Sequence, residues 1–136
     1  MKKVVFSIVS ILFVCILLSF SFPYQNDLES SVKRGSNIYA SNCIACHMDS
    51  GEGMAGVFPP LKGSDYLKDK KKVIQAMLNG LQGEITVNGK KYNSAMPASG
   101  LNNKEIADVI TYVNNTWGNK GARTTEQEVA ALRKKK

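Results

Sequence analysis

The densest reactive chemistry in the sequence lies in the five residues Cys43 to His47. The thiols of Cys43 and Cys46 are three positions apart, so each can add across a vinyl group of one haem. The imidazole of His47 follows directly and can reach the iron from the same side. The pattern Cys-x-x-Cys-His is typical of c-type haem attachment, and His47 is the only histidine in the chain. These residues predict one covalently bound haem with His47 as an axial iron ligand.

Other uses of this cluster fit the sequence less well. A thioredoxin-like redox pair is expected within alternating strands and helices, and the chain has few strand signals. A structural zinc site needs four nitrogen or sulfur ligands, whereas the cluster supplies three and the remaining cysteine, Cys15, lies in the N-terminal apolar segment. A plain disulfide between Cys43 and Cys46 would leave His47 without a role.

The opposite face of the iron takes a second ligand or stays open. Without a second histidine, the choices are methionine, lysine, water or an open position. Four of the five methionines are poor candidates for this ligand. Met1 lies in the N-terminal segment, Met48 and Met54 are too near His47 in sequence, and Met77 belongs to the core face of a predicted helix. Met96 remains, and Pro97 after it disfavours helix there. A thioether ligand raises the reduction potential relative to a second histidine, and it closes the iron to substrates, which favours electron transfer over catalysis.

A Pro-Pro loop begins at Pro59, twelve residues after His47. A ligating histidine normally donates its other ring N–H to a carbonyl group, and a rigid proline loop can hold such a carbonyl still. An ordinary turn is the other interpretation, and the pattern alone does not decide between them. The candidates for packing against the haem or supporting its ligands are Pro59, Leu61, Tyr92 and Pro97.

Helical periodicity predicts two helices that frame these motifs. The first covers about 28–42 and contains Gly35, which is unfavourable inside a helix by about 1 kcal/mol. We interpret this glycine as a point where another backbone comes close. The second helix covers 70–81, with Met77 on its apolar face as a core side chain.

A third helix is predicted to start at Asn102, a good N-cap, with Glu105 placed for a capping box. Its apolar stripe continues to Trp117. Asn88-Gly89 between two short β-prone segments is the strongest hairpin signal in the chain. We therefore predict an all-α fold, with about three to four helices around one haem and a small β-hairpin, over residues 26–118.

The N-terminal 21 residues have the pattern of an export signal. Lys2 and Lys3 precede an apolar run broken only by serines, and small residues allow cleavage after Ser21. The run is also long enough to stay as a membrane anchor, since roughly 20 apolar residues span a bilayer. Lipidation of Cys15 is a weaker alternative. Each interpretation predicts that the rest of the chain is periplasmic or at the outer face of the cytoplasmic membrane, with membrane association possible through this segment.

The formal net charge of +7 is unevenly placed. Residues 22–118 contain ten Lys or Arg and nine Asp or Glu, whereas residues 119–136 contain six and two. A nucleic-acid-binding protein would concentrate basic residues on its folded face, so we do not expect nucleic-acid binding. We expect residues 119–136 to form a basic polar tail with local helix at most and without packing on the domain.

Over about 28–119, the chain resembles the class I monohaem cytochromes c. The positions that match are the attachment motif Cys43, Cys46 and His47, the helix-crossing residues Gly35, Tyr39, Tyr112 and Trp117, Pro59, Leu61, and the ligand loop Met96-Pro97. The resemblance implies that the Pro59 carbonyl accepts from the ligand histidine and that Leu61 packs on the haem. It also implies His47 and Met96 as axial ligands of haem c.

Within this family, the chain is similar to the cytochrome c modules associated with copper nitrite reductases and quinoprotein dehydrogenases. The resemblance implies an electron carrier rather than an enzyme, with iron cycling between Fe(III) and Fe(II). The expected partners are redox proteins such as an oxidase, a nitrite reductase or a quinoprotein dehydrogenase. The alternatives are an electron-transfer subunit of a membrane-bound oxidoreductase complex and, less favoured, a single-haem enzyme with an open sixth position.

Overall fold

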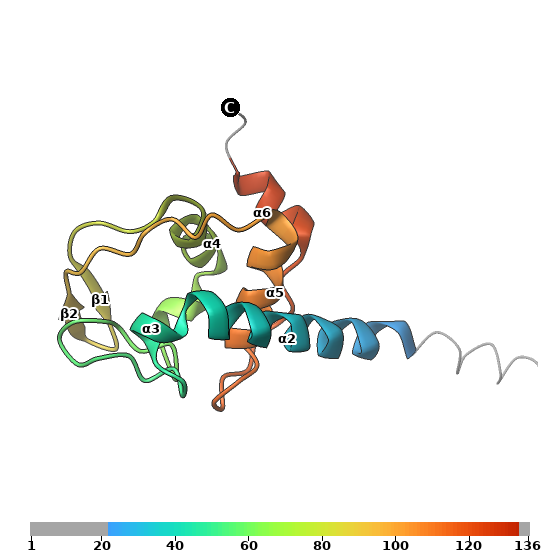
Figure 1. Cartoon of the computed structure of the whole chain (residues 1–136), viewed down its shortest axis with the longest axis horizontal. Coiled ribbons are helices and arrows are strands. Elements are labelled where there is room, and N and C mark those ends of the chain that lie inside the picture. The colour runs from blue at the N-terminus through green and yellow to red at the C-terminus, as the bar shows by residue number, and fades with distance from the viewer. Residues whose placement is uncertain (1–21, 134–136) are drawn as a thin grey trace, which may run out of the picture. The chain divides into compact units, whose positions relative to one another are not determined.

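The computed structural model describes the backbone of residues 22–133 and the side chains of residues 27–133 (Figure 1). The chain divides into two units, residues 1–30 and 31–136, and the candidate site lies within the second. The helices are α2 (Phe22–Asn42), α3 (Ile44–His47), η1 (Asp65–Lys68, a 3-10 helix), α4 (Lys70–Asn79), α5 (Asn103–Val113) and α6 (Glu126–Leu132). Two strands, β1 (Ile85–Val87) and β2 (Lys90–Tyr92), form one antiparallel pair.

The all-α class with a small hairpin is confirmed. The described residues contain more helices than the three to four expected, because the single-turn helices α3 and η1 and the C-terminal helix α6 are added. The first helix also begins earlier than expected, at Phe22 instead of Leu28.

Helices α2 and α5 cross at Gly35 (Figure 1). A Cβ atom at position 35 would lie 2.1 Å from the carbonyl oxygen of Asp108 and 2.7 Å from the Cβ of Tyr112. Neither atom can yield cheaply, because both belong to or adjoin the backbone of a packed helix. The helix-destabilising glycine is therefore explained by close approach, as its position in the sequence indicated.

A buried carboxylate fastens this crossing. Asp108 is 3% exposed and accepts hydrogen bonds from Ser31 Oγ at 2.6 Å, from Arg34 Nε and Nη2 at 2.6 and 2.8 Å, and from Lys104 Nζ at 3.1 Å. Burial alone would raise the pKa of Asp108, but the hydrogen bonds from Arg34, Ser31 and Lys104 outweigh it and lower the pKa. The sequence analysis missed this cluster, whose one local sign is a charged residue inside the apolar stripe of α5.

Helix α4 begins at Lys70 as predicted but ends at Asn79 instead of Leu81, and the hairpin forms where it was predicted. The carboxylate of Asp69 caps α4 by accepting from Lys72 N at 3.1 Å, and Met77 is a buried core residue as expected. The hairpin turns at Asn88-Gly89 and pairs Ile85 with Tyr92. Val87 and Tyr92 bury one face of it.

Helix α5 begins as predicted but ends earlier. Asn102 and Glu105 form the capping box, yet the helix stops at Val113, and Trp117 has φ of 55° outside it. Because the helix ends here, carbonyls of its last turn lack backbone N–H donors, and side-chain amides donate to them instead. Asn115 Nδ2 donates to Thr111 O and Asn119 Nδ2 donates to Val113 O, both at 2.8 Å. The expected extension of the helix to Trp117 is wrong. The four-residue spacing from Val113 to Trp117 suits a helix, but it also suits a turn that follows the helix.

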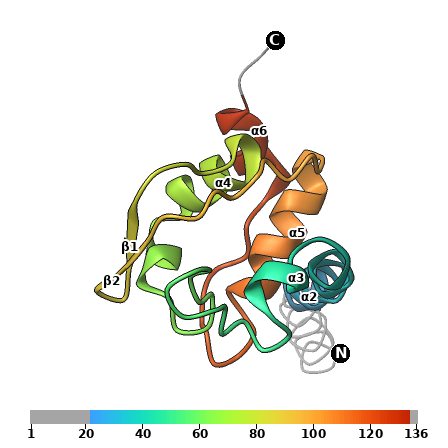
Figure 2. The same cartoon turned by 60° about the vertical axis from the view of Figure 1, so that its left-hand side comes forward.

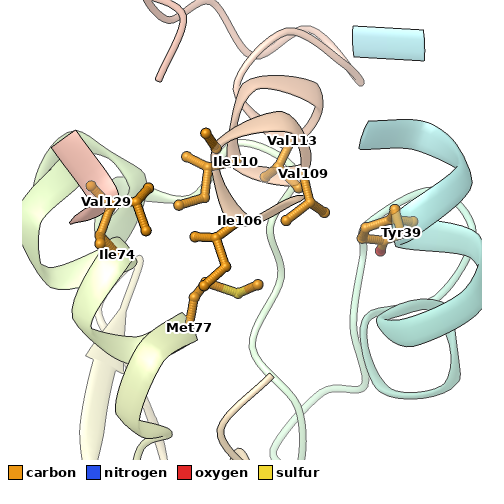
Figure 3. Close-up of a cluster of buried hydrophobic side chains, with 9 residues drawn as sticks. Tyr39, Ile74, Met77, Ile106, Val109, Ile110, Val113 and Val129 are labelled. Carbon is orange, nitrogen blue, oxygen red and sulfur yellow. The ribbon is translucent and has the colours of Figure 1, made fainter. Parts of the chain in front are cut away.

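The expectation that residues 119–136 do not pack is also wrong. Helix α6 is capped by Thr125 and Glu128, and its Val129 is fully buried, beside Ile74 of α4 in the core (Figure 3). Figure 2 shows α6 next to α4 and α5. Lys70 Nζ bonds Glu128 Oε1 at 2.9 Å. The expectation was based on the basic composition of this segment and overlooked Val129, whose burial is enough to dock a short capped helix.

The predicted export signal, residues 1–21, lies outside the described residues. Among residues 22–133, no helix is both long enough and apolar enough to cross a membrane. The alternatives for the N-terminal segment therefore stay predictions.

Candidate functional site

The attachment motif forms its own turn of helix. Helix α2 ends at Asn42, and His47 N donates to Cys43 O at 2.9 Å across α3. Residues three and four positions apart share one face of a helix, so the thiols of Cys43 and Cys46 and the imidazole of His47 lie together on it. Cys43 is half-buried, whereas Cys46 is exposed.

The Cys43 side chain is a neutral thiol at neutral pH. Burial, and then the nearby Cys46, raises the pKa of Cys43 to about 11. In the described part of the chain, no three His, Cys, Asp or Glu side chains gather where they could hold a metal ion.

His47 Nδ1 lies 3.1 Å from the backbone carbonyl oxygen of Pro59. A carbonyl only accepts, so Nδ1 carries the proton and Nε2 keeps its lone pair. Burial lowers the pKa of His47, and the hydrogen bond to Pro59, which raises it, is the smaller effect. The imidazole is therefore neutral at pH 7, as a metal ligand must be. The Pro59 carbonyl thus lies where the sequence analysis expected an acceptor for the second ring nitrogen of His47.

Aromatic side chains support the residue after His47. Tyr39 Oη donates to Met48 O at 2.7 Å, where Met48 takes a positive φ of 61°. The rings of Tyr39, Tyr112 and Trp117 meet pairwise at centroid distances of 5.2–5.5 Å in tilted or edge-on contacts. A Cβ at Gly51 would lie 2.6 Å from the Trp117 ring. The cluster thus anchors the chain on both sides of the histidine.

A cavity opens beside His47. The space between its walls is about 720 Å³, with the part open to solvent included. Apolar side chains from α4, α5, the hairpin and the proline loop line most of it. The predicted site residues that line it are Cys43, His47, Pro59, Leu61 and Met96.

Three predicted site residues do not line this cavity. Cys46 is exposed on α3, Tyr92 is buried under the hairpin, and Pro97 is exposed. The sequence missed other lining residues, among them Leu81 and Val87. From their positions in the strands, the sequence could not show that Val87 lines the cavity and that Tyr92 does not.

Two methionines line the cavity, Met77 and Met96. Met77 belongs to the hydrophobic core and lies beneath Ile106 of α5 (Figure 3). Met96 is half-buried and forms a two-residue antiparallel bridge with Leu81, at 2.8 Å from Leu81 N to Met96 O and 2.9 Å in return. A Cβ at Gly80 would lie 2.6 Å from Met96 O, so Gly80 allows this bridge to close.

The family model of cytochrome c matches residues 32–117, which contain the motif, the crossing helices and the cavity. The chain belongs to the cytochrome c family. Cytochrome c-552 of Thermus thermophilus is 40% identical over 113 residues, which cover 75% of this chain and 86% of that protein.

Two longer relatives of this cytochrome c are subunits of dehydrogenases. The gluconate 2-dehydrogenase cytochrome c subunit of Pantoea cypripedii is 33% identical over 108 residues, 74% of this chain and 24% of that protein. The alcohol dehydrogenase (quinone) cytochrome c subunit of Gluconacetobacter polyoxogenes is 30% identical over 105 residues, 73% and 22% respectively. The similarity to cytochrome c modules of quinoprotein dehydrogenases, expected from the sequence, is confirmed.

Family membership implies covalently bound haem c, and the residues present fit that group. The cavity offers an apolar lining for the porphyrin, with the Cys43 thiol and the His47 imidazole at its wall. The Nδ1–H of His47 is already used by Pro59, which leaves Nε2 for iron. Cytochromes c are electron-transfer proteins, and haem c supplies one-electron chemistry at the iron.

Proposed function

We propose that this cytochrome c is an exported electron carrier whose haem is joined to Cys43 and Cys46 and ligated by His47 and Met96. The observation that carries the proposal is that one apolar cavity is lined by both His47 and Met96. The Pro59 carbonyl orients the neutral imidazole of His47, and the bridge to Leu81 holds the backbone of Met96. A histidine and a methionine together would leave no position for a substrate. The iron would then only exchange electrons.

Met96 is favoured over Met77 as the second ligand by its packing. Met77 is 8% exposed and is already packed in the core, whereas Met96 sits in a loop with exposed neighbours on both sides. A core side chain that turned to the iron would leave a cavity behind. The thioether of Met96 can bind the iron without leaving such a cavity in the core.

The ligand test replaces each methionine in turn. Met96→His should lower the midpoint potential substantially while the haem stays covalently attached, because histidine gives a lower potential than methionine. Met77→Leu, the matched control, should change stability more than potential. If the reduced spectrum and potential respond to Met77→Leu and not to Met96→His, the assignment of Met96 is wrong.

Carbon monoxide binding to the reduced protein separates the carrier from a single-haem enzyme. A methionine-ligated iron should bind it slowly and incompletely, since the thioether must leave first. Rapid and complete binding by the unchanged protein would contradict the carrier and favour an open sixth position.

A second candidate, an electron-transfer subunit of a membrane-bound oxidoreductase, is favoured by the similarity to the two dehydrogenase subunits. The redox partner would then be a dehydrogenase that delivers electrons to the haem. Co-purification from gently solubilised membranes tests this candidate. Recovery of the chain only in the soluble periplasmic fraction would favour the diffusible carrier, and recovery in the cytoplasm would contradict export.

A further inference from the structure

The loop after His47 contains a glycine, Gly53, that lies against the backbones of both His47 and Pro59. The amide of Gly53 donates to His47 O at 3.1 Å. On its other side, a Cβ at position 53 would lie 2.7 Å from Pro59 O, 2.8 Å from Pro59 C and 2.4 Å from Phe58 O. Gly53 also has φ of 64°, where side chains are rarely tolerated. The carbonyl that orients the ligand histidine thus occupies space that only glycine leaves open.

All three of these atoms belong to a backbone that has little freedom to move. Met54 and Phe58 form a short antiparallel bridge, with hydrogen bonds of 2.9 Å from Met54 N to Phe58 O and 2.8 Å from Phe58 N to Met54 O. The ring of Pro59 restricts its own φ. A side chain at position 53 must therefore displace the carbonyls of Phe58 and Pro59, because no flexible group is available to yield instead.

We propose that Gly53 is a positioning residue that lets the Pro59 carbonyl reach His47, and that it thereby sets the reduction potential of the haem. The inference rests on the proposed function, in which His47 is an axial ligand. A displaced carbonyl accepts a weaker bond from Nδ1–H, so the imidazole becomes less basic and donates less to the iron. The oxidised iron loses more stabilisation than the reduced iron. Substitution at Gly53 therefore shifts the midpoint potential to more positive values.

Gly56 provides a matched control in the same loop. It has a comparable φ of 75°, and a Cβ there would meet nothing within 4 Å. Gly53→Ala and Gly56→Ala therefore carry a similar backbone strain, and they differ in the collision with Pro59. Any effect of strain alone appears in both variants.

The experiment compares the two variants as full-length, haem-loaded proteins. The first measurement is the midpoint potential, and the second is the proton NMR signal of the Nδ1–H in the reduced protein with its rate of exchange with solvent. Since His47 is the only histidine in the chain, this signal needs no separate assignment among histidines. Gly53→Ala should shift the potential upward and speed exchange several-fold, whereas Gly56→Ala should leave both at the wild-type values.

A milder pair covers the case in which Gly53→Ala does not fold. Asparagine tolerates positive φ better than alanine, so Gly53→Asn against Gly56→Asn repeats the comparison with less strain. Potentials and exchange rates that are equal in the two variants would overturn the proposal. So would failure of both Gly53 variants to attach haem, because the residue would then serve folding rather than positioning.

Failure of the proposed function has a different signature. Wild-type protein without covalent haem would refute both the carrier and the role of Gly53. Wild type and Gly56→Ala with haem and a reversible potential, together with an unchanged Gly53→Ala, would refute the role of Gly53 alone.

Discussion

The two loops that face the cavity, residues 48–63 after His47 and residues 93–101 around Met96, are held in contrasting ways. The first loop is closed mainly on itself, since Leu61 N donates to Gly51 O at 2.8 Å and Gly53 N donates to His47 O at 3.1 Å. The second loop is held by other elements. Met96 pairs with Leu81, which follows α4.

Further contacts of the second loop come from more distant parts of the chain. Ser99 N donates to Met77 O at 3.0 Å, and Arg133, just after α6, donates to Leu101 O at 2.8 Å and to Asn103 Oδ1 at 2.6 Å. The comparison shows that the histidine side has its own local backbone hydrogen bonds, to which Trp117 and Asn119 add distant contacts. The methionine side lacks such local closure and depends on how α4 and α6 pack. Changes remote from the haem should therefore disturb the methionine first.

The largest effect is expected from Gly80→Ala, which attacks the methionine side directly. Gly80 has φ of 76° and ψ of −179°, a region essentially restricted to glycine, and its Cβ would collide with Met96 O. We expect a loss of about 3–4 kcal/mol of unfolding free energy, with faster carbon monoxide binding to the reduced haem. Gly83→Ala, with positive φ but open space around its Cβ, is the control. Equal carbon monoxide rates in the two variants would argue against a pinned methionine loop.

The second effect concerns the crossing that both sides share. Asp108→Asn should cost about 2–3 kcal/mol of unfolding free energy, because the amide lacks the negative charge and one of the two oxygens that accept from Arg34 and Lys104. Arg34 and Lys104 are each about half exposed, so water offsets part of the loss. Haem ligation should be unchanged, and denaturant titration with parallel absorption spectra checks both statements.

The same carboxylate predicts a pH dependence. Because the pKa of Asp108 is lowered in the folded protein, its contribution is present above its unfolded pKa, about 3.9. The contribution is lost as the pH falls below that value towards the folded pKa. The stability difference between wild type and Asp108→Asn should therefore shrink between pH 5 and the acid limit of folding. A difference that grows with acidification would show that the carboxylate is not held ionised.

A third, smaller effect is expected at the C-terminal helix. Val129→Ala should cost about 2 kcal/mol, since a fully buried valine loses its contacts with α4 and α5. Val57→Ala removes a side chain that is 38% exposed and should cost much less. If the methionine side depends on α6, Val129→Ala should also quicken carbon monoxide binding while leaving the exchange of the His47 ring proton unchanged.

The smallest effect is expected on the histidine side. Tyr39→Phe removes the hydrogen bond to Met48 O and should cost about 1 kcal/mol, with the aromatic packing kept. The reporter is the exchange rate of the His47 Nδ1–H, which should rise slightly while carbon monoxide binding stays unchanged. An effect on carbon monoxide binding alone would reverse the assignment of the two sides.

Much of this protein was predictable from the sequence where partners are neighbours in the chain. The attachment motif, the Asn88-Gly89 hairpin and the Asn102–Glu105 capping box depend on residues at most a few positions apart, and the capping box and hairpin formed as predicted. The contact of His47 with Pro59 spans twelve residues. The proline loop by itself left an ordinary turn open, and only the resemblance to class I cytochromes c implied this contact. The ligands themselves remain a proposal that the methionine variants test.

Only the tertiary structure decided the features whose partners are distant. Helix α6 packs because Val129 fits against Ile74, a match between surfaces that composition and charge do not reveal. Helix α5 ends at Val113, and Trp117 beyond it packs against Gly51 and Tyr39. The sequence by itself therefore determined which chemistry the chain carries, through local geometry. The tertiary structure decided what holds that chemistry in place, because packing depends on surfaces that meet only after folding.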